Sequence, residues 1–142
     1  MTSQNCPFCN IDKEKSRIIE ERKYVYVMFS NPRLMPGHLL IIPKRHIEKM
    51  ILLEEAERKE LFDTILEYQE KITQKIAEGC DVRQNYRPFI PQSMLKVDHV
   101  HVHLQPRTLN DALYQQRQHY EAELFKNLTQ KEISDIEKFL MS

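Results

Sequence analysis

The chain has 142 residues, and its 21 lysine and arginine residues are balanced by 21 aspartate and glutamate residues. This length is typical of one domain that is large enough to bury a hydrophobic core. The charge balance argues against duplex nucleic acid or a membrane surface as a partner, and two glycines are too few for a glycine-rich phosphate loop. Polar N-terminal residues and the lack of a long apolar stretch lead us to expect a cytoplasmic protein.

A Cys-x-x-Cys pair, Cys6-Pro7-Phe8-Cys9, stands near the start of the chain. The total of three cysteines is odd, which disfavours a disulfide framework. The polar residues after Cys9 do not predict the long helix that usually follows a redox pair. The spacing therefore favours half of a zinc site over a redox pair or idle thiols. We expect a cysteine knuckle over residues 1–10 and a packing role for Cys80.

β-branched and aromatic residues predict strands over residues 17–21 and 23–29, joined by a hairpin turn at Glu20-Glu21-Arg22. A second turn is expected at Met35-Pro36-Gly37, where Gly37 is free to take a positive φ. Residues 38–42 then predict a strongly apolar strand. The short connections, rich in proline and glycine, favour antiparallel pairing.

One long helix is expected over residues 54–78, and Gly79 is a natural C-terminal cap for it. Apolar residues recur at intervals of three or four and predict a single buried stripe. The stripe consists of Leu61, Ile65, Tyr68, Ile72 and Ile76.

Another strand is predicted over residues 85–90, where Pro91 ends it, and a polar connection follows over 92–96. Two helices are expected at the end of the chain. The first covers residues 113–128, and the second begins at a capping box formed by Thr129 and Glu132.

Three histidines stand at alternate positions in Val97-Asp98-His99-Val100-His101-Val102-His103-Leu104-Gln105-Pro106-Arg107. In an extended strand they share one face, while the apolar residues between them form the other face. Imidazoles titrate near neutrality, so the row offers nucleophiles, proton donors and metal ligands. Close like charges also disfavour protonation of all three. We favour this functional interpretation over an exposed histidine-rich strand or an accidental metal site.

The order of elements predicts an α+β fold for a single domain, 1–142, in which one antiparallel sheet of about five strands packs against helices. We see no internal repeat and no domain boundary. Residues 108–142 are expected to form a C-terminal helical extension.

The stretch His99-Val100-His101-Val102-His103-Leu104-Gln105-Pro106-Arg107 resembles the signature of the histidine triad (HIT) family of nucleotide hydrolases and transferases. Residues 37–46 are similar to the second hallmark of that family, and Cys6-Pro7-Phe8-Cys9 is similar to the zinc knuckle of its bacterial-type members. The three matches occur in family order. The resemblance implies a homodimeric α+β fold and nucleotide substrates.

The resemblance also implies a covalent mechanism in which His101 attacks the α-phosphate and forms a nucleotidyl-histidine. Water, or another acceptor, then takes the nucleotide. By analogy, His103 and His38 donate hydrogen bonds to the α-phosphate or to the departing group.

In the zinc-binding branch of the family, the implied ligands are Cys6, Cys9, His46 and His99. Two thiolates and two imidazoles leave no open position, which is typical of a structural zinc site. Without the knuckle, His46 would be interpreted as a surface residue beside Lys44 and Arg45.

The chain departs from the family where a Gly-Gln-Ser stretch usually precedes the triad. The corresponding region here contains Gln92 and Ser93, and it is about three residues longer if Asn85 is the asparagine typical of the family. Lys96 lies where the serine is expected. We hypothesise that its ammonium replaces a phosphate contact, with a solvated loop lysine as the alternative.

Ser30 occupies the position of the acidic residue that binds ribose in the family, so Asn31 is our candidate for the ribose hydroxyls. Gln105 replaces an apolar residue and creates a second register, similar to the transferase branch, in which His103 would be the nucleophile. Pro106-Arg107 fits the first register better and favours His101.

The favoured function is hydrolysis of a dinucleoside polyphosphate, a nucleoside phosphoramidate or an adenylate. The alternatives are a nucleotidyl transferase or phosphorylase and a nucleotide-binding adaptor with vestigial activity. We expect no membrane or duplex nucleic-acid partner.

Overall fold

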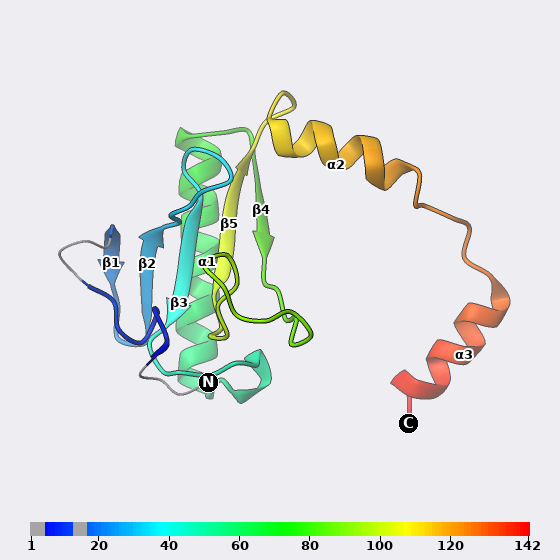
Figure 1. Ribbon diagram of the computed structural model, residues 1–142, viewed down its shortest axis with the longest axis horizontal. Helices are drawn as coiled ribbons and strands as arrows, with labels where there is room; N and C mark the ends of the chain where they lie inside the picture. The colour runs from blue at the N-terminus through cyan, green and yellow to red at the C-terminus, as the bar shows by residue number, and fades with distance from the viewer. Residues whose placement is uncertain (1–4, 13–16) are drawn as a thin grey trace. The chain divides into compact units, whose positions relative to one another are not determined.

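The computed structural model in Figure 1 describes residues 5–12 and 17–142. The chain divides into two compact units, Met1–Asp111 and Ala112–Ser142. The first unit contains the sheet, the long helix and all the predicted site residues. The second contains helices α2 (Ala112–Ala122) and α3 (Gln130–Leu140). In these described ranges, no helix combines the length and the apolar character that a membrane span requires.

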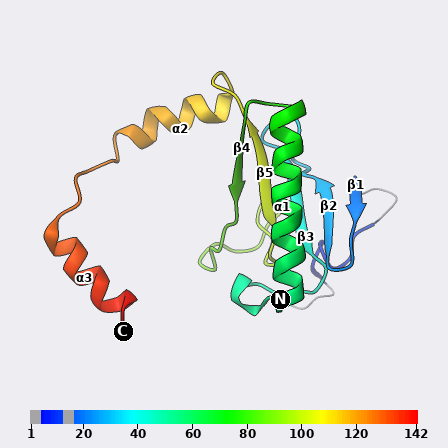
Figure 2. The same cartoon turned by 180° about the vertical axis from the view of Figure 1, so that it is seen from behind.

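The sheet of the first unit has five strands in the order β1-β2-β3-β5-β4, and every neighbouring pair is antiparallel. The long helix α1 (Glu55–Lys75) lies across one face of this sheet (Figure 2). This architecture confirms the predicted fold class. The strands are β1 (Ile18–Glu21), β2 (Val25–Phe29), β3 (Leu39–Pro43), β4 (Gly79–Arg83) and β5 (Val102–Arg107), and a short 3₁₀ helix, η2 (Met50–Leu52), precedes α1.

The hydrophobic core lies between α1 and the sheet. The helix contributes the predicted stripe, of which Leu61, Ile65, Tyr68 and Ile72 are buried. The sheet contributes alternate residues of its strands, including Val102 and Leu104 of β5, and Val100 adds to the core from the segment just before β5. The prediction for Ile76 was wrong, because this side chain is 56% exposed beyond the end of the helix.

Both ends of α1 differ slightly from the prediction. The helix starts at Glu55, after a capping box in which Glu54 and Glu57 each bond the backbone of the other. It ends at Lys75, with Ile76 as the C-cap. Gly79 is therefore not the cap. It begins β4 instead, where it pairs with Arg107.

The prediction of a strand over residues 85–90 was wrong, because β4 lies earlier in the chain, at Gly79–Arg83. The apolar and aromatic residues that suggested a strand at 85–90 belong to an irregular connection, 84–101, which contains no helix or strand. Two prolines in that segment cannot donate ladder hydrogen bonds. The pairing of β4 with β5 overrides the low strand propensity of its glycine and aspartate.

Smaller corrections concern the boundaries of elements. The first hairpin turns at residues 22–24, where the Arg22 N–H donates to the Val25 carbonyl over 2.8 Å. Helix α2 ends at Ala122 rather than at residue 128. Two predictions are confirmed: Gly37 has a φ of 84°, and Thr129 and Glu132 form the capping box of α3.

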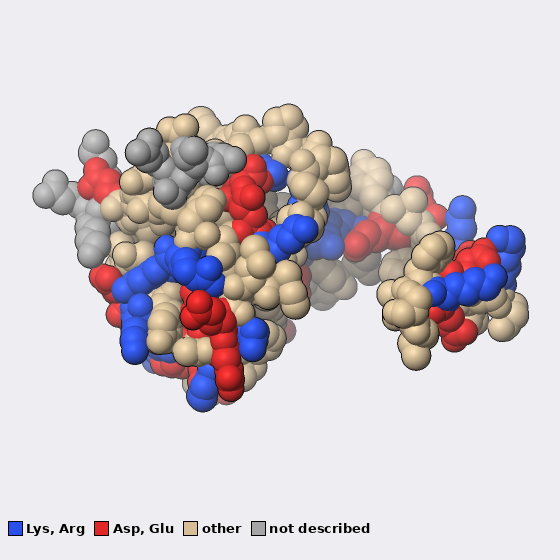
Figure 3. Space-filling view, turned by 90° about the horizontal axis from the view of Figure 1, so that it is seen from below, with Lys and Arg blue, Asp and Glu red and all other residues tan. Residues whose placement is uncertain are grey.

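Basic and acidic side chains lie beside one another on the face seen in Figure 3, and neither kind forms a continuous charged patch there. This interspersion agrees with the balanced charge of the chain.

Candidate active site

The three histidines lie at the start of β5 and in the segment that leads into it. Only His103 belongs to the strand ladder, opposite Leu40, whereas His99 and His101 precede the first residue of β5. Alternation nevertheless continues through all three positions, because Val100 and Val102 between them are buried in the core. The imidazole rings of His101 and His103 are neighbours, with centroids 4.9 Å apart.

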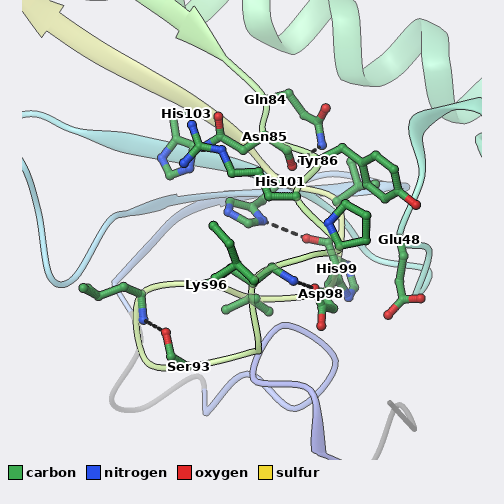
Figure 4. A pocket seen from close by; sticks show the side chains of 16 residues that line it. Glu48, Gln84, Asn85, Tyr86, Ser93, Lys96, Asp98, His99, His101 and His103 are labelled. Atoms are coloured by element: carbon green, nitrogen blue, oxygen red, sulfur yellow. Dashed lines mark hydrogen bonds and ion pairs between the residues drawn. The ribbon is translucent and has the colours of Figure 1, made fainter.

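The His101 ring has one nitrogen committed to the backbone. Its Nδ1 lies 2.7 Å from the carbonyl oxygen of His99 (Figure 4), and only an N–H can donate to that oxygen. Burial lowers the pKa of His101 despite this hydrogen bond, so the ring is neutral near pH 7. The proton of the neutral ring is therefore on Nδ1, and Nε2 carries a free electron pair.

His38 and His103 form a relay that fixes their tautomers. The N–H of Leu34 donates to Nδ1 of His38 over 3.1 Å, so the proton of a neutral His38 is on Nε2. That Nε2 donates to Nδ1 of His103 over 2.9 Å, which leaves the proton of His103 on its own Nε2.

Burial, followed by the charge of His101, lowers the pKa of His38 to about 4. Burial is also the main cause that lowers the pKa of His103 to about 3, with contributions from His101, His38 and Arg83. Both rings are therefore neutral at pH 7. His38 is 3% exposed, and its Nε2 bonds to His103.

A cluster of four metal-ligand side chains lies next to the histidine row. The ligand atoms of Cys6, Cys9, His46 and His99 all lie within 4.8 Å of one another. Nδ1 of His99 is 3.3 Å from the Cys6 sulfur and 3.2 Å from Nδ1 of His46, and Cys9 Sγ is 3.2 Å from that same His46 atom. Ligand atoms around tetrahedral zinc are separated by about 3.3–3.8 Å. These distances therefore fit a tetrahedral ion.

The chemistry of the donors also fits a cation. Nε2 of His99 donates to the Pro43 carbonyl over 2.7 Å, which turns the electron pair of Nδ1 toward the cluster. Burial, together with the adjacent Cys6, raises the pKa of the Cys9 thiol to about 11. A thiol with a raised pKa becomes a thiolate at neutral pH only beside a strong positive charge.

A cavity of about 460 Å³ opens beside His101 and His103. Its wall includes the predicted residues Asn85, Ser93 and Lys96, which come from the irregular connection between β4 and β5 (Figure 4). The Lys96 ammonium forms an ion pair with Asp98 at this wall. The cavity volume is in the range of pockets that bind small molecules.

The other predicted residues of this connection form hydrogen bonds with its backbone or with β4. Asn85 Oδ1 accepts from Nε of Arg83 over 3.1 Å, and Ser93 Oγ accepts from the Leu95 N–H over 3.1 Å. Gln92 Oε1 accepts from the Asp98 N–H over 3.1 Å, and Gln92 is not one of the described residues that line the cavity.

Asn31 lies apart from this wall. It is an exposed residue in the loop after β2, and the lining of the cavity does not include it. The structure therefore brings His101 and His103 together with the cavity wall, and places His38 against His103. It also brings Cys6, Cys9, His46 and His99 together with one another, and it does not place Asn31 at the cavity wall.

Sequence reasoning missed several residues at the site, among them Tyr86, Arg83 and Phe8. Tyr86 lines the cavity, and Arg83 pairs with His103 across β4 and β5. Phe8 packs its ring against His101. The position of Phe8 between the two cysteines was a usable signal, whereas Arg83 depended on a strand that was predicted elsewhere.

The chain is similar to known proteins of one family. The model of the HIT domain matches residues 11–110. An uncharacterized HIT-like protein from Chlamydia muridarum is 31% identical over 94 residues, which span 64% of this chain and 70% of that protein.

Solved structures show the same fold. A HIT family protein from Bacillus anthracis matches with a TM-score of 0.71 at 23% identity. The match covers 99% of this chain and 97% of the Bacillus chain. A Zn-bound histidine triad family protein from Mycobacterium smegmatis has a TM-score of 0.66 at 22% identity, covering 79% and 81% of the two chains. Because the domain match covers most of the chain, this protein belongs to the HIT family.

Proposed function

We propose that the protein is a nucleotide hydrolase that cleaves its substrate at the α-phosphate through a nucleotidyl-histidine intermediate on His101. Membership of the HIT family supports a nucleotide substrate. The observation that carries the mechanism is the hydrogen bond from His101 Nδ1 to the His99 carbonyl. It leaves the Nε2 electron pair of a neutral ring beside a cavity, as a nucleophile requires.

In the first step, the electron pair of His101 Nε2 forms a bond to the α-phosphorus while the bond to the leaving group breaks. The Nε2–H of His103, held by the relay from His38, donates a hydrogen bond to the phosphoryl oxygen or to the departing group. In the second step, water attacks the same phosphorus atom. The P–N bond breaks, its electrons return to His101, and the proton of the water leaves to solvent.

The wall of the cavity supplies the contacts to the phosphate. Lys96 and Ser93 line the cavity together with Asn85, and Asp98 holds the Lys96 ammonium near the histidines. We assign Lys96 to a phosphoryl oxygen, since a cation there neutralises charge that the attack concentrates. Gln92 supports this wall through the backbone of Asp98. Asn31 remains our candidate for the ribose.

The second register, with His103 as the nucleophile, has less support. Nδ1 of His103 is occupied by the hydrogen bond with His38. Gln105, which would end the motif in that register, is 1% exposed and is not one of the described residues that line the cavity. His101 therefore remains the nucleophile of the proposal.

We also propose that Cys6, Cys9, His46 and His99 bind a structural zinc ion. The four ligands leave no open position, so zinc would supply a cross-link between the knuckle and the histidine row rather than chemistry on the substrate. The Zn-bound protein from Mycobacterium smegmatis supports this assignment. Elemental analysis is expected to find one zinc ion per purified chain and its loss in Cys6→Ser. An unchanged zinc content in that variant would reject the site.

The family likeness further supports a homodimer. Sedimentation equilibrium is expected to give twice the mass of the chain, and a single-chain mass at micromolar concentration would contradict this assignment.

Turnover assays test the hydrolase proposal. The unsubstituted protein and His101→Ala are compared on a dinucleoside polyphosphate and on a nucleoside phosphoramidate, each with and without inorganic phosphate. We expect His101→Ala to lower turnover by about 10⁴-fold or more, as for loss of other catalytic nucleophiles. Full activity of His101→Ala would refute the proposal. A product that requires inorganic phosphate would instead identify a phosphorylase.

A further inference from the structure

Phe8 contacts the proposed nucleophile directly. Its ring lies edge-on to the imidazole of His101, with centroids 5.1 Å apart and an interplanar angle of 68°. The same ring meets His99 at 5.8 Å and 89°. Both geometries are the T-shaped arrangement that aromatic pairs favour. One side chain of the cysteine knuckle therefore contacts both a metal-cluster ligand and the catalytic histidine.

The knuckle is built to hold this ring in one place. The carbonyl of Cys6 accepts three hydrogen bonds, from the Cys9 N–H at 3.2 Å, the Asn10 N–H at 3.1 Å and the Asn10 side-chain amide at 3.0 Å. Cys6 itself is 1% exposed. Because Phe8 lies inside this closed turn, the position of its backbone follows from the anchoring of the two cysteines, and its ring packs against His99 and His101.

One hydrogen bond and two ring contacts bear on the orientation of His101. The bond from Nδ1 to the His99 carbonyl fixes one edge of the ring, and the His103 ring lies 4.9 Å away, centroid to centroid. The torsion about the Cβ–ring bond of histidine has a broad profile, so a single hydrogen bond restrains it weakly. The Phe8 ring supplies the additional packing contact.

We propose that Phe8 is a positioning residue that holds the His101 imidazole in the orientation from which Nε2 attacks, and that the Cys6/Cys9/His46/His99 cluster acts on the reaction through this ring. The proposal rests on the proposed function of His101. It assigns to the knuckle an effect on the rate of the covalent step, in addition to its effect on folding.

The test uses Phe8→Leu, which keeps an apolar side chain without a ring, and Phe8→Tyr, which keeps the ring. Phe62→Leu is the matched control, since Phe62 is 57% exposed on α1. Each variant is compared with the unsubstituted protein in the zinc-loaded form. The measurements are the zinc content, the rate of nucleotidylation of His101 in a single turnover, the substrate KM, and the exchange with water of the His101 Nδ1 proton observed by NMR.

Phe8→Leu is expected to retain zinc, to exchange the Nδ1 proton faster, and to nucleotidylate His101 between about 2- and 10-fold more slowly, as the loss of one aromatic pair implies. Its KM should change less than the rate. Phe8→Tyr and Phe62→Leu should match the unsubstituted protein. Unchanged exchange in zinc-loaded Phe8→Leu would overturn the proposal, as would a raised KM with an unchanged rate, which identifies Phe8 as a wall of the substrate site.

Removal of zinc with a chelator tests the second part of the proposal in protein that stays folded by circular dichroism. We expect faster exchange of the Nδ1 proton in the unsubstituted protein and little further change in Phe8→Leu. An equal acceleration in both proteins would show that the cluster acts through the His99 backbone rather than through Phe8, and would overturn this part.

Failure of the proposed function gives a different result. If the unsubstituted protein forms no nucleotide adduct with any substrate, the hydrolase proposal fails, while the exchange of the Nδ1 proton still reports whether Phe8 and zinc restrain the His101 ring.

Discussion

At the scale of single residues, the histidines are distinguished by where their protons are held. His101 donates to a carbonyl and keeps a free Nε2, whereas His103 accepts from His38 and keeps an Nε2–H. In the proposed mechanism, the same residue type thus supplies a nucleophile and a hydrogen-bond donor side by side. Alternation in the sequence predicted that the imidazoles would share one face. The tautomers could not be predicted, because they depend on Leu34 and on the carbonyl of His99.

Protonation of His38 couples the site to stability. Burial lowers the pKa of His38 from its usual value near 6.5 to about 4, so the unfolded chain binds more protons than the native state in this window. The contribution of neutral His38 to the free energy of unfolding is therefore fully present above pH 6.5, and it is lost as the pH falls toward 4. The free energy of unfolding, measured with denaturant, should decrease between pH 7 and pH 5. This decrease should be about 2 kcal/mol smaller in His38→Asn than in the unsubstituted protein. Equal decreases would contradict neutral burial of His38.

Lys96 was predicted as a phosphate ligand from a position where the family has a serine, and the structure places it at the cavity wall. A charged hydrogen bond to phosphate contributes about 1.5–3 kcal/mol, so Lys96→Ala should lower kcat/KM by about 10- to 100-fold. Lys59→Ala, on the exposed face of α1, should have no effect. Normal activity of Lys96→Ala would identify Lys96 as a solvated loop residue.

At the scale of elements, the strands with apolar alternation were predictable and β4 was not. Residues of β3 are buried throughout, and their sequence is correspondingly apolar. Strand β4 lies at the edge of the sheet and contains glycine, aspartate and arginine. Its composition therefore does not indicate a strand, although it pairs with β5. The true strand places Arg83 opposite His103, and the misplaced strand therefore hid this neighbour of the site.

Gly37 makes the turn that leads into β3 and His38. Its φ of 84° disfavours any side chain, and an added Cβ would lie 3.1 Å from Cγ of Pro106. Gly37→Ala should therefore lower the free energy of unfolding by about 1–2 kcal/mol or more. Gly79→Ala is the control, since Gly79 has no positive φ and its added Cβ would lie 3.4 Å from Arg107. Equal loss of stability in the two variants, measured by thermal unfolding, would contradict this account of the turn.

At the scale of the whole molecule, the site combines segments that are distant in sequence. The knuckle, the end of β3 and the histidine segment meet at one cluster, with Cys6 and His99 separated by 93 positions. The resemblance to the HIT family implied that these segments share one metal site. The cavity wall could not be predicted from the sequence. The path of the irregular connection 84–101 depends on hydrogen bonds such as that between Gln92 and Asp98, and no periodic pattern in the sequence encodes them.

The buried hydrophobic residues of the described chain all lie between Cys6 and Leu104, and α3 buries none. A chain that ends at Asp111 should therefore keep a cooperative thermal transition. A chain that ends at His101 lacks β5, whose neighbours are β3 and β4, and should not fold. Loss of the cooperative transition in the chain ending at Asp111 would show that residues 112–142 contribute to the stability of the first unit.

The most direct test of the central claim is the site of the covalent adduct. A phosphoramidate formed during turnover is trapped by an alkaline quench, and the modified peptide is sequenced by mass spectrometry. Our account predicts a nucleoside monophosphate on His101, and no adduct on that peptide in His101→Ala. An adduct on His103, or turnover of a nucleotide substrate with no adduct on any histidine of the row, would contradict it.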